Sequence, residues 1–284
     1  MIGVFDSGHG GLTVFTALVE RFPRYDWLYY GDHAHAPYGS RPNREVVELT
    51  QTAVAKLFMA GCKLVILGCN TATAVAGRTL QQEWLPTVNA QRGGHRILGI
   101  IAPTVEAVTQ TPWSVKEPVF PQKYNTDVYA LFATEVTVRS GVYEAEVAKR
   151  CPKARVVSLA CPKLVPLIES GALKAQMAAA AKIYVDELLV KSGVIPQWAI
   201  LGCTHFPLIE DLFRAALPPQ VRILSQPQVV ADGLEDYLAR HPDVVGSRVA
   251  SGRGAVQYFT SGEPSEVSRV AGVMLGRQII FGRF

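Results

Sequence analysis

The chain has 284 residues, of which 49% are hydrophobic and 18% are charged, and its net charge is +4 at neutral pH. This length allows one large domain or two modest ones with a substantial core. The basic residues form no long run, which argues against nucleic acid as the main partner. The start MIGVFDSGHGG lacks the basic and apolar regions of a signal peptide, and no apolar run is long enough to span a bilayer. The composition therefore predicts a cytoplasmic protein with no membrane partner.

Short apolar runs alternate along the chain with amphipathic segments. The helical pattern is clearest at 43–60 and 172–191, and a glycine follows each segment. Strand and helix in alternation predict an α/β fold with mostly parallel sheets flanked by helices. The runs that we interpret as buried strands are 2–5, 27–30, 64–67, 97–101, 129–133, 155–159, 198–201 and 221–224. The segment at 111–125, rich in proline and aromatic residues, predicts an irregular surface loop.

Two cysteines follow matching apolar runs. LVILGCNTAT at 64–73 contains Cys69, and WAILGCTHFP at 198–207 contains Cys203. Ligands of open α/β sheets bind beyond the carboxyl ends of strands, so two facing lobes would bring both thiols to one cleft. Helix N-terminal N–H groups at such a place stabilise a thiolate or hold a carboxylate. The ordinary alternative, a buried cysteine that acts as a small hydrophobe, does not explain the repeated polar context.

Five cysteines make an odd number, and none of them forms a C-x-x-C pair. This spacing favours neither a disulfide framework nor a structural zinc site. His33 and His35 have no third ligand at a convincing spacing, so we predict no bound metal. The glycine-rich turn DSGHGG at 6–11 matches neither nucleotide-binding pattern, and a nucleotide cofactor is unsupported.

Polar residues gather near the same predicted strand ends. His205 can exchange protons near neutral pH, and Asp6 can bind an ammonium group or direct the proton of a thiol. Glu169 lies among apolar residues, where a carboxylate either accepts a hydrogen bond at the edge of the core or assists a nearby base. The other candidate binding residues are Ser7, Pro37, Tyr38, Gly39, Ser40, Asn70, Thr71, Thr134, Thr137 and Thr204.

Taken together, these segments resemble the glutamate racemase family. The matching motifs are IGVFDSGxGGLTV at 2–14, GDxAxxPYGSR at 31–41, CNTA at 69–72, ATxxTxxSxxY at 133–143, CPxLVPLIExG at 161–171, LGCTHFPL at 201–208 and YFTSGEP at 258–264. They cover nearly the whole chain in the right order. The resemblance implies two pseudo-symmetric α/β lobes, 1–94 plus 206–284 and 95–205, with the active site between them.

The resemblance also implies the activity, which is the interconversion of L- and D-glutamate without a cofactor, supplying D-glutamate for peptidoglycan. Cys69 and Cys203 match the two acid/base cysteines of the family, Cys69 for D-glutamate and Cys203 for L-glutamate. Asp6, Glu169 and His205 match groups that tune the thiols. A homodimer is implied in the same way. The positions that match substrate contacts are Asp6, Ser7, Tyr38, Gly39, Asn70, Thr71, Thr204 and His205.

Some residues depart from the family pattern. His9 stands where a small apolar residue is usual, His33 and His35 replace a common Thr and Arg, and the 109–127 region looks longer. Other functions also stay open on the sequence alone. They are an aspartate or broader amino-acid racemase, a cysteine hydrolase using Cys203 and His205, a two-cysteine redox protein, and a catalytically silent amino-acid binder.

Overall fold

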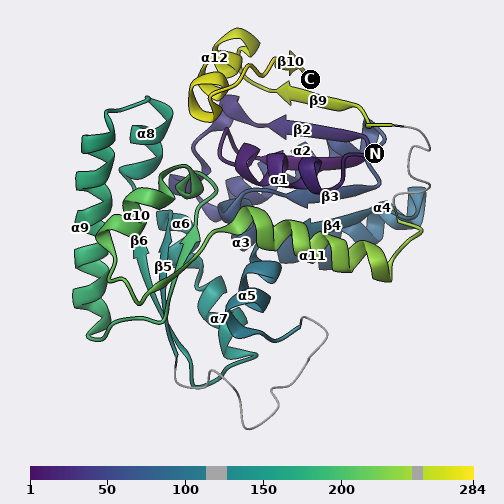
Figure 1. Cartoon of the computed structure of the whole chain (residues 1–284). Helices are drawn as coiled ribbons and strands as arrows, with labels where there is room; N and C mark the ends of the chain where they lie inside the picture. The colour runs from purple at the N-terminus through teal and green to yellow at the C-terminus, as the bar shows by residue number, and fades with distance from the viewer. Residues whose placement is uncertain (113–126, 245–251) are drawn as a thin grey trace.

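The computed structural model describes residues 1–112, 127–244 and 252–284, and it contains two sheets whose strands all pair in parallel (Figure 1). The first sheet has the order β10-β9-β2-β1-β3-β4, and the second has the order β6-β5-β7-β8. The strands are β1 (Ile2–Asp6), β2 (Trp27–Gly31), β3 (Leu64–Leu67), β4 (Arg96–Gly99), β5 (Val128–Ala133), β6 (Arg155–Ala160), β7 (Trp198–Gly202), β8 (Arg222–Leu224), β9 (Val256–Thr260) and β10 (Gly282–Arg283).

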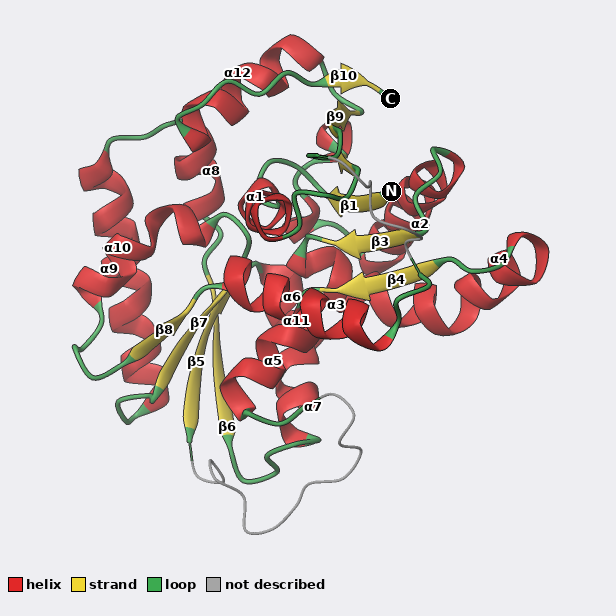
Figure 2. Ribbon diagram, turned by 45° about the vertical axis from the view of Figure 1, so that its right-hand side comes forward, coloured by secondary structure: helices red, strands yellow, loops and turns green. Residues whose placement is uncertain are grey.

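Helices flank both sheets, with α11 running along the first and α9 along the outer side of the second (Figures 1 and 2). The helices are α1 (Leu12–Arg21), α2 (Asn43–Met59), α3 (Asn70–Thr79), α4 (Leu85–Arg92), α5 (Ile101–Thr109), α6 (Glu135–Ser140), α7 (Val142–Ala148), α8 (Leu164–Glu169), α9 (Lys174–Ser192), α10 (Glu210–Ala216), α11 (Gln226–Arg240) and α12 (Pro264–Leu275). Shorter helical turns span His33–His35, Tyr38–Ser40, Leu80–Trp84 and Phe206–Ile209. In the described part of the chain, no helix combines the length and the apolar character needed to cross a membrane.

Each sheet has apolar side chains on both faces, because successive residues of a strand point to opposite sides. In β1, Val4 packs in a core cluster with α1 and α11, whereas Phe5 packs in another with α2 and α3. In β5, Phe132 joins a cluster with α8, α9 and α10, and Leu131 joins one with α5 and α7. This two-sided burial explains why the strands are continuous apolar runs, as parallel sheets require.

The two sheets repeat one arrangement of four strands. The order β2-β1-β3-β4 in the first sheet corresponds to β6-β5-β7-β8 in the second. The strands β3 and β7 therefore occupy equivalent places, and Cys69 and Cys203 follow them at equivalent strand ends. The repeated ILGC segment is thus the sequence trace of a structural duplication.

All eight predicted strands are present, but the predicted lobe boundaries do not match the sheets. β4 pairs with β3 in the first sheet, although residues 95–205 were assigned to the second lobe. β8 pairs with β7 in the second sheet, although residues 206–284 were assigned to the first. The chain therefore leaves the first sheet after Gly99 and the second after Leu224, and each sheet gains one strand that was predicted in the other lobe and loses one to it. The strands β9 and β10 complete the first sheet, as the resemblance implied for the C-terminal segment.

The predicted helices at 43–60 and 172–191 correspond to α2 and α9. Residues 113–125 of the predicted surface loop lie outside the described residues, as does most of the longer 109–127 region.

Candidate active site

A cavity of about 340 Å³ lies between the lobes at the carboxyl ends of their central strands. Cys69 from the first lobe and Cys203 from the second both line it, as their positions after β3 and β7 predict. The other predicted site residues that line the cavity are Asp6, Ser7, Pro37, Tyr38, Gly39, Ser40, Asn70, Thr71, Thr134, Glu169, Thr204 and His205.

Cys69 is the N-cap residue of α3. Its Sγ accepts a hydrogen bond from the backbone N–H of Ala72 at 3.4 Å and lies 3.4 Å from Ser7 Oγ. Burial, together with the nearby Asp6 carboxylate, raises the pKa of the Cys69 thiol to about 12, and these effects outweigh the two hydrogen bonds. Cys69 is therefore a thiol at neutral pH in the protein without substrate.

Cys203 has a different environment, in which the partner of the sulfur is a histidine side chain and not a backbone N–H at the start of a helix. Its Sγ lies 3.8 Å from His205 Nδ1, and His205 Nε2 lies 2.8 Å from Glu169 Oε1. Burial lowers the pKa of His205, but hydrogen bonding and charge interaction with Cys203 and Glu169 outweigh burial and raise this pKa to about 10. His205 is therefore an imidazolium at neutral pH that can donate to the sulfur on one side and to the carboxylate on the other.

Threonine hydroxyl groups join the lobes on the side of the cavity next to Cys69. Thr71 Oγ1 lies 2.9 Å from Thr134 Oγ1 and 3.3 Å from Thr137 Oγ1. Thr134 also caps α6 by accepting from the backbone N–H of Thr137. Thr137, a predicted substrate contact, is 1% exposed and does not line the cavity. Because α6 turns its side chain inward, Thr137 instead supports Thr71 and Thr134 from behind.

The loop with Pro37-Tyr38-Gly39-Ser40 lines the cavity, and the side chain of Tyr38 also anchors the loop to the rest of the lobe. The Tyr38 ring is buried, and its hydroxyl donates to Asp32 Oδ2 at 2.7 Å. Ser261 Oγ donates to the other oxygen of Asp32, and His35 contacts both oxygens. Asp32 thereby ties this loop to the segment that follows β9.

The carboxamide of Asn70 forms hydrogen bonds to other residues of the protein. Its Nδ2 donates to Gln226 Oε1 at 2.6 Å, and its Oδ1 accepts from the Tyr143 hydroxyl at 2.7 Å. Gln226 is fully buried, and its Nε2 lies 2.9 Å from Thr104 Oγ1 and 3.1 Å from Asn70 Oδ1. This network joins α3 to α5, α7 and α11 directly behind Cys69, so it fixes the start of α3 against both lobes.

We expect Gln226→Leu to lower the free energy of unfolding by about 2–4 kcal/mol, because it removes the acceptor of the buried Asn70 Nδ2 and one of the two hydrogen bonds of Thr104 Oγ1, which keeps its bond to the Ile100 backbone oxygen. Urea denaturation measures the change. The control is Gln228→Leu, which alters an exposed glutamine two residues along the same helix and should change stability little. Equal losses in the two variants would contradict the role of the network.

The glycine-rich turn lets the first lobe approach the second closely. A Cβ atom on Gly10 would lie 2.4 Å from His205 Nδ1 and 2.6 Å from Thr204 Oγ1, so only glycine fits at this contact. The next turn adds a direct bond, because Thr13 Oγ1 donates to the backbone oxygen of Thr204 at 2.8 Å. The turn therefore serves as a close contact with the Cys203 segment.

Several residues that line the cavity were not among the predicted site residues. Glu135 stands at the start of α6, and an apolar wall comes from the residues that follow β6 and from the first turn of α8. These wall residues belong to the CPxLVPLIExG motif, whose small and apolar residues give no chemical signal of their own. They are Cys161, Pro162, Val165 and Pro166.

His33 and His35 lie outside the cavity and contact different partners. His33 Nδ1 lies 2.8 Å from Thr260 Oγ1, whereas His35 contacts Asp32. The described residues include no group of three or more His, Cys, Asp or Glu side chains placed to hold a metal ion. The five cysteines are all buried and unpaired.

Fold and site together define a two-lobed α/β protein that presents one cysteine from each lobe to a single cavity. A scan against protein-family models finds no match. A glutamate racemase of Phenylobacterium zucineum is 44% identical over 99% of this chain and 98% of its own length. The chain belongs to the glutamate racemase family and is therefore an isomerase, an amino-acid racemase.

Solved structures agree with this assignment. A glutamate racemase isoform of Bacillus anthracis has a TM-score of 0.82 and 26% identity, with coverage of 100% of this chain and 97% of its own. A glutamate racemase of Francisella tularensis, solved in complex with D-glutamate, has a TM-score of 0.78 and 25% identity over 99% of this chain and 95% of its own.

Proposed function

We propose that the protein interconverts L- and D-glutamate by proton transfer between the substrate α-carbon and two cysteines. The observation that carries this proposal is the pair Cys69 and Cys203, which reach one cavity from equivalent strand ends of two lobes. Removing a proton from one face of an α-carbon and returning one to the other face needs either a base that moves or two bases. Two thiols on facing lobes provide the second solution.

The two thiols lie in unequal electrostatic surroundings, which suits this reaction. Cys69 is a thiol because burial and Asp6 disfavour its charge, whereas the His205 imidazolium stabilises negative charge on Cys203. With Cys203 as the thiolate and Cys69 as the thiol, Cys203 removes the α-proton of L-glutamate and Cys69 returns a proton to the opposite face, giving D-glutamate. In the reverse direction the thiolate is on Cys69 and the proton is on Cys203. The number of protons on the enzyme is the same before and after each turnover.

The α-carboxylate is best accommodated near the start of α3. There the first backbone N–H groups of the helix have no helical partners, and the Thr71 hydroxyl lies beside them. Donors on this carboxylate stabilise the negative charge that develops when the α-proton leaves. Asp6 and Glu169 line the same cavity and suit the substrate ammonium group.

Glutamate is the proposed substrate because a relative that is 44% identical is a glutamate racemase, and a related glutamate racemase was solved in complex with D-glutamate. Aspartate or a broader range of amino acids is the alternative within the same mechanism. The biological role that we propose is the supply of D-glutamate for peptidoglycan. A homodimer and a cytoplasmic location remain predictions from the sequence, which sedimentation velocity and cell fractionation test.

The direct test is circular dichroism of L-glutamate and of D-glutamate with the purified protein and no added cofactor. We expect both enantiomers to reach the same racemic endpoint, and L-aspartate to be turned over at least tenfold more slowly. Equal turnover of the two substrates would favour the broader racemase. A constant signal with either glutamate enantiomer would refute the proposal.

A further inference from the structure

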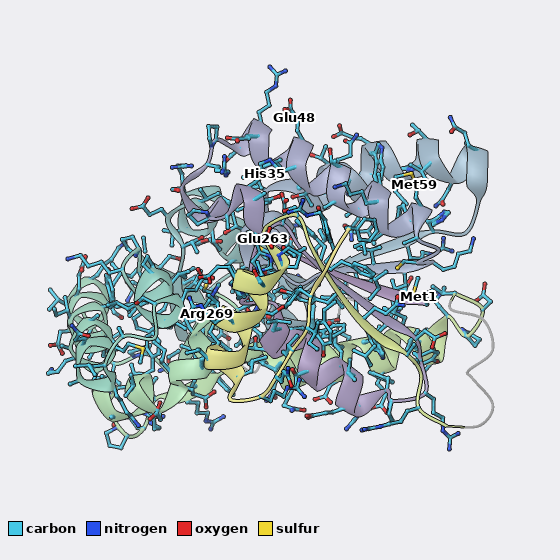
Figure 3. All side chains as sticks on the ribbon, turned by 90° about the horizontal axis from the view of Figure 1, so that it is seen from above. Met1, His35, Glu48, Met59, Glu263 and Arg269 are labelled. Atoms are coloured by element: carbon cyan, nitrogen blue, oxygen red, sulfur yellow. The ribbon has the colours of Figure 1, made fainter. Side chains whose placement is uncertain are left out.

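His9 lies in the glycine-rich turn and extends the polar chain that starts at Cys203. Its Nδ1 lies 3.3 Å from Glu169 Oε1, the same oxygen that His205 contacts at 2.8 Å. Its Nε2 lies 3.2 Å from the backbone oxygen of Val267 in α12. In the view from above, α12 is marked by Arg269, and Glu263 lies just before its first residue (Figure 3).

The two partners of the His9 ring decide its charge. A carboxylate and a backbone carbonyl are both acceptors, whereas a neutral imidazole has only one N–H to donate. Only the imidazolium form can donate to both acceptors, and the His9 side chain is 8% exposed. Glu169 remains a carboxylate, because hydrogen bonds from His205 and His9 hold its pKa well below the ordinary value although burial raises it.

The other charged and titratable groups near His9 leave this balance in place. Glu266 on α12 interacts electrostatically with His9 and is itself paired with Arg269. His33, whose ring centroid lies 4.2 Å from that of His9, stays neutral because burial and the charge on His9 lower its pKa to about 3. Asp6 lies further along the chain of charges, within electrostatic reach of His205 and Glu169.

The charge on His9 matters because the cavity is poor in cations. Its carboxylates are those of Asp6, Glu135 and Glu169, and no described lysine or arginine lines it. A Cys203 thiolate, the His205 imidazolium and the Glu169 carboxylate together carry one net negative charge. Adding His9 makes this group neutral, which favours both the thiolate and the approach of an anionic amino acid.

We propose that His9 is a positioning residue for the Cys203 end of the site, which as an imidazolium shares Glu169 with His205 and stabilises the Cys203 thiolate. This inference rests on the proposed two-cysteine function and adds a residue to it. His9 does not touch the cavity itself and acts through Glu169 and His205.

The test replaces His9 with asparagine, because the Asn amide nitrogen can replace Nδ1 as a donor to Glu169 but carries no charge. His9→Gln is a second neutral variant, and His33→Asn is the matched control, since His33 is an adjacent, half-buried histidine that is already neutral. In each protein the ultraviolet thiolate absorbance is titrated with pH, and the signal of the same protein with Cys203→Ala is subtracted.

We expect His9→Asn to move the midpoint of Cys203 thiolate formation up by about one pH unit, and His33→Asn to leave it in place. The value of kcat/KM for glutamate at pH 7 should fall about tenfold, and the loss should shrink as the pH rises. An unmoved thiolate midpoint, a loss of activity that is equal at every pH, or unfolding of both neutral variants would each overturn the proposal. The thiolate titration needs no turnover, so it gives its answer even if the protein does not racemise glutamate.

Discussion

Cys69→Ala and Cys203→Ala should each reduce glutamate racemisation by about 1000-fold or more, because alanine can neither accept nor return a proton. Both cysteines are nearly buried, at 6% and 5% exposed, and losing one sulfur atom should cost only about 1–2 kcal/mol of stability. Circular dichroism at a wavelength specific to glutamate measures the activity, and thermal unfolding measures the fold. Cys62→Ala is the control, since this buried cysteine packs in the core between α2 and the first sheet.

The two variants should also differ from each other in a way that a structural defect would not produce. In deuterated water, Cys69→Ala retains the Cys203 base and should exchange the α-hydrogen of L-glutamate but not that of D-glutamate. Cys203→Ala should show the opposite preference. Full racemase activity in either variant would contradict the two-base mechanism.

The hydrogen-bonded row of Cys203, His205 and Glu169 would also suit a cysteine hydrolase. Such an enzyme would not need Cys69 and would form an acyl-enzyme that can be trapped.

The features that could be predicted best from the sequence are the buried strands and the two cysteines that follow them. Buried parallel strands are continuous apolar runs, so all eight predicted strands are present, and the cysteines that end two of them reach one cavity. The weaker predictions concern how distant segments pair. Nothing local in 97–99 or 222–224 says which sheet each strand joins, because strand partners are far apart in the sequence.

The sequence also did not determine which polar side chains of the motifs face the cavity and which bond within the protein. Thr137 and Asn70 lie in motifs with a polar character that suggested contact with substrate. In the structure, Thr137 supports two other threonines, and the Asn70 carboxamide is bonded to Gln226 and Tyr143. Gln226 lies in a segment with no recognised motif, and only its hydrogen bonds to Asn70 and Thr104 show its purpose. His9 departs from the family pattern, and its contact with Glu169, 160 residues away in the sequence, explains the departure.

Glu169→Gln should lower kcat/KM for glutamate about 100-fold and move the alkaline limb of its pH profile to lower pH. The His205 pKa of about 10 depends on Glu169 as well as on Cys203, so a neutral amide at 169 allows His205 to lose its proton nearer to neutral pH. Steady-state kinetics between pH 6 and about 10.5 would measure the shift. Glu135→Gln is the matched control, because it removes a carboxylate from the same cavity without altering the His205–Glu169 pair. An unmoved alkaline limb would contradict this assignment.

The same substitution should affect stability within a defined pH range. The pKa of His205 is raised from 6.5, so its contribution is complete below about pH 6.5 and is lost as the pH rises to about 10. The pKa of Glu169 is lowered from 4.5, so its contribution is complete above about pH 4.5 and is lost in acid. The difference in Tm between wild type and Glu169→Gln should therefore be largest at pH 4.5–6.5 and nearly absent at pH 10. Because the Glu169 side chain is 33% exposed, the largest effect should be about 1–2 kcal/mol. A difference that is constant with pH would mean that Glu169 contributes packing and not charge.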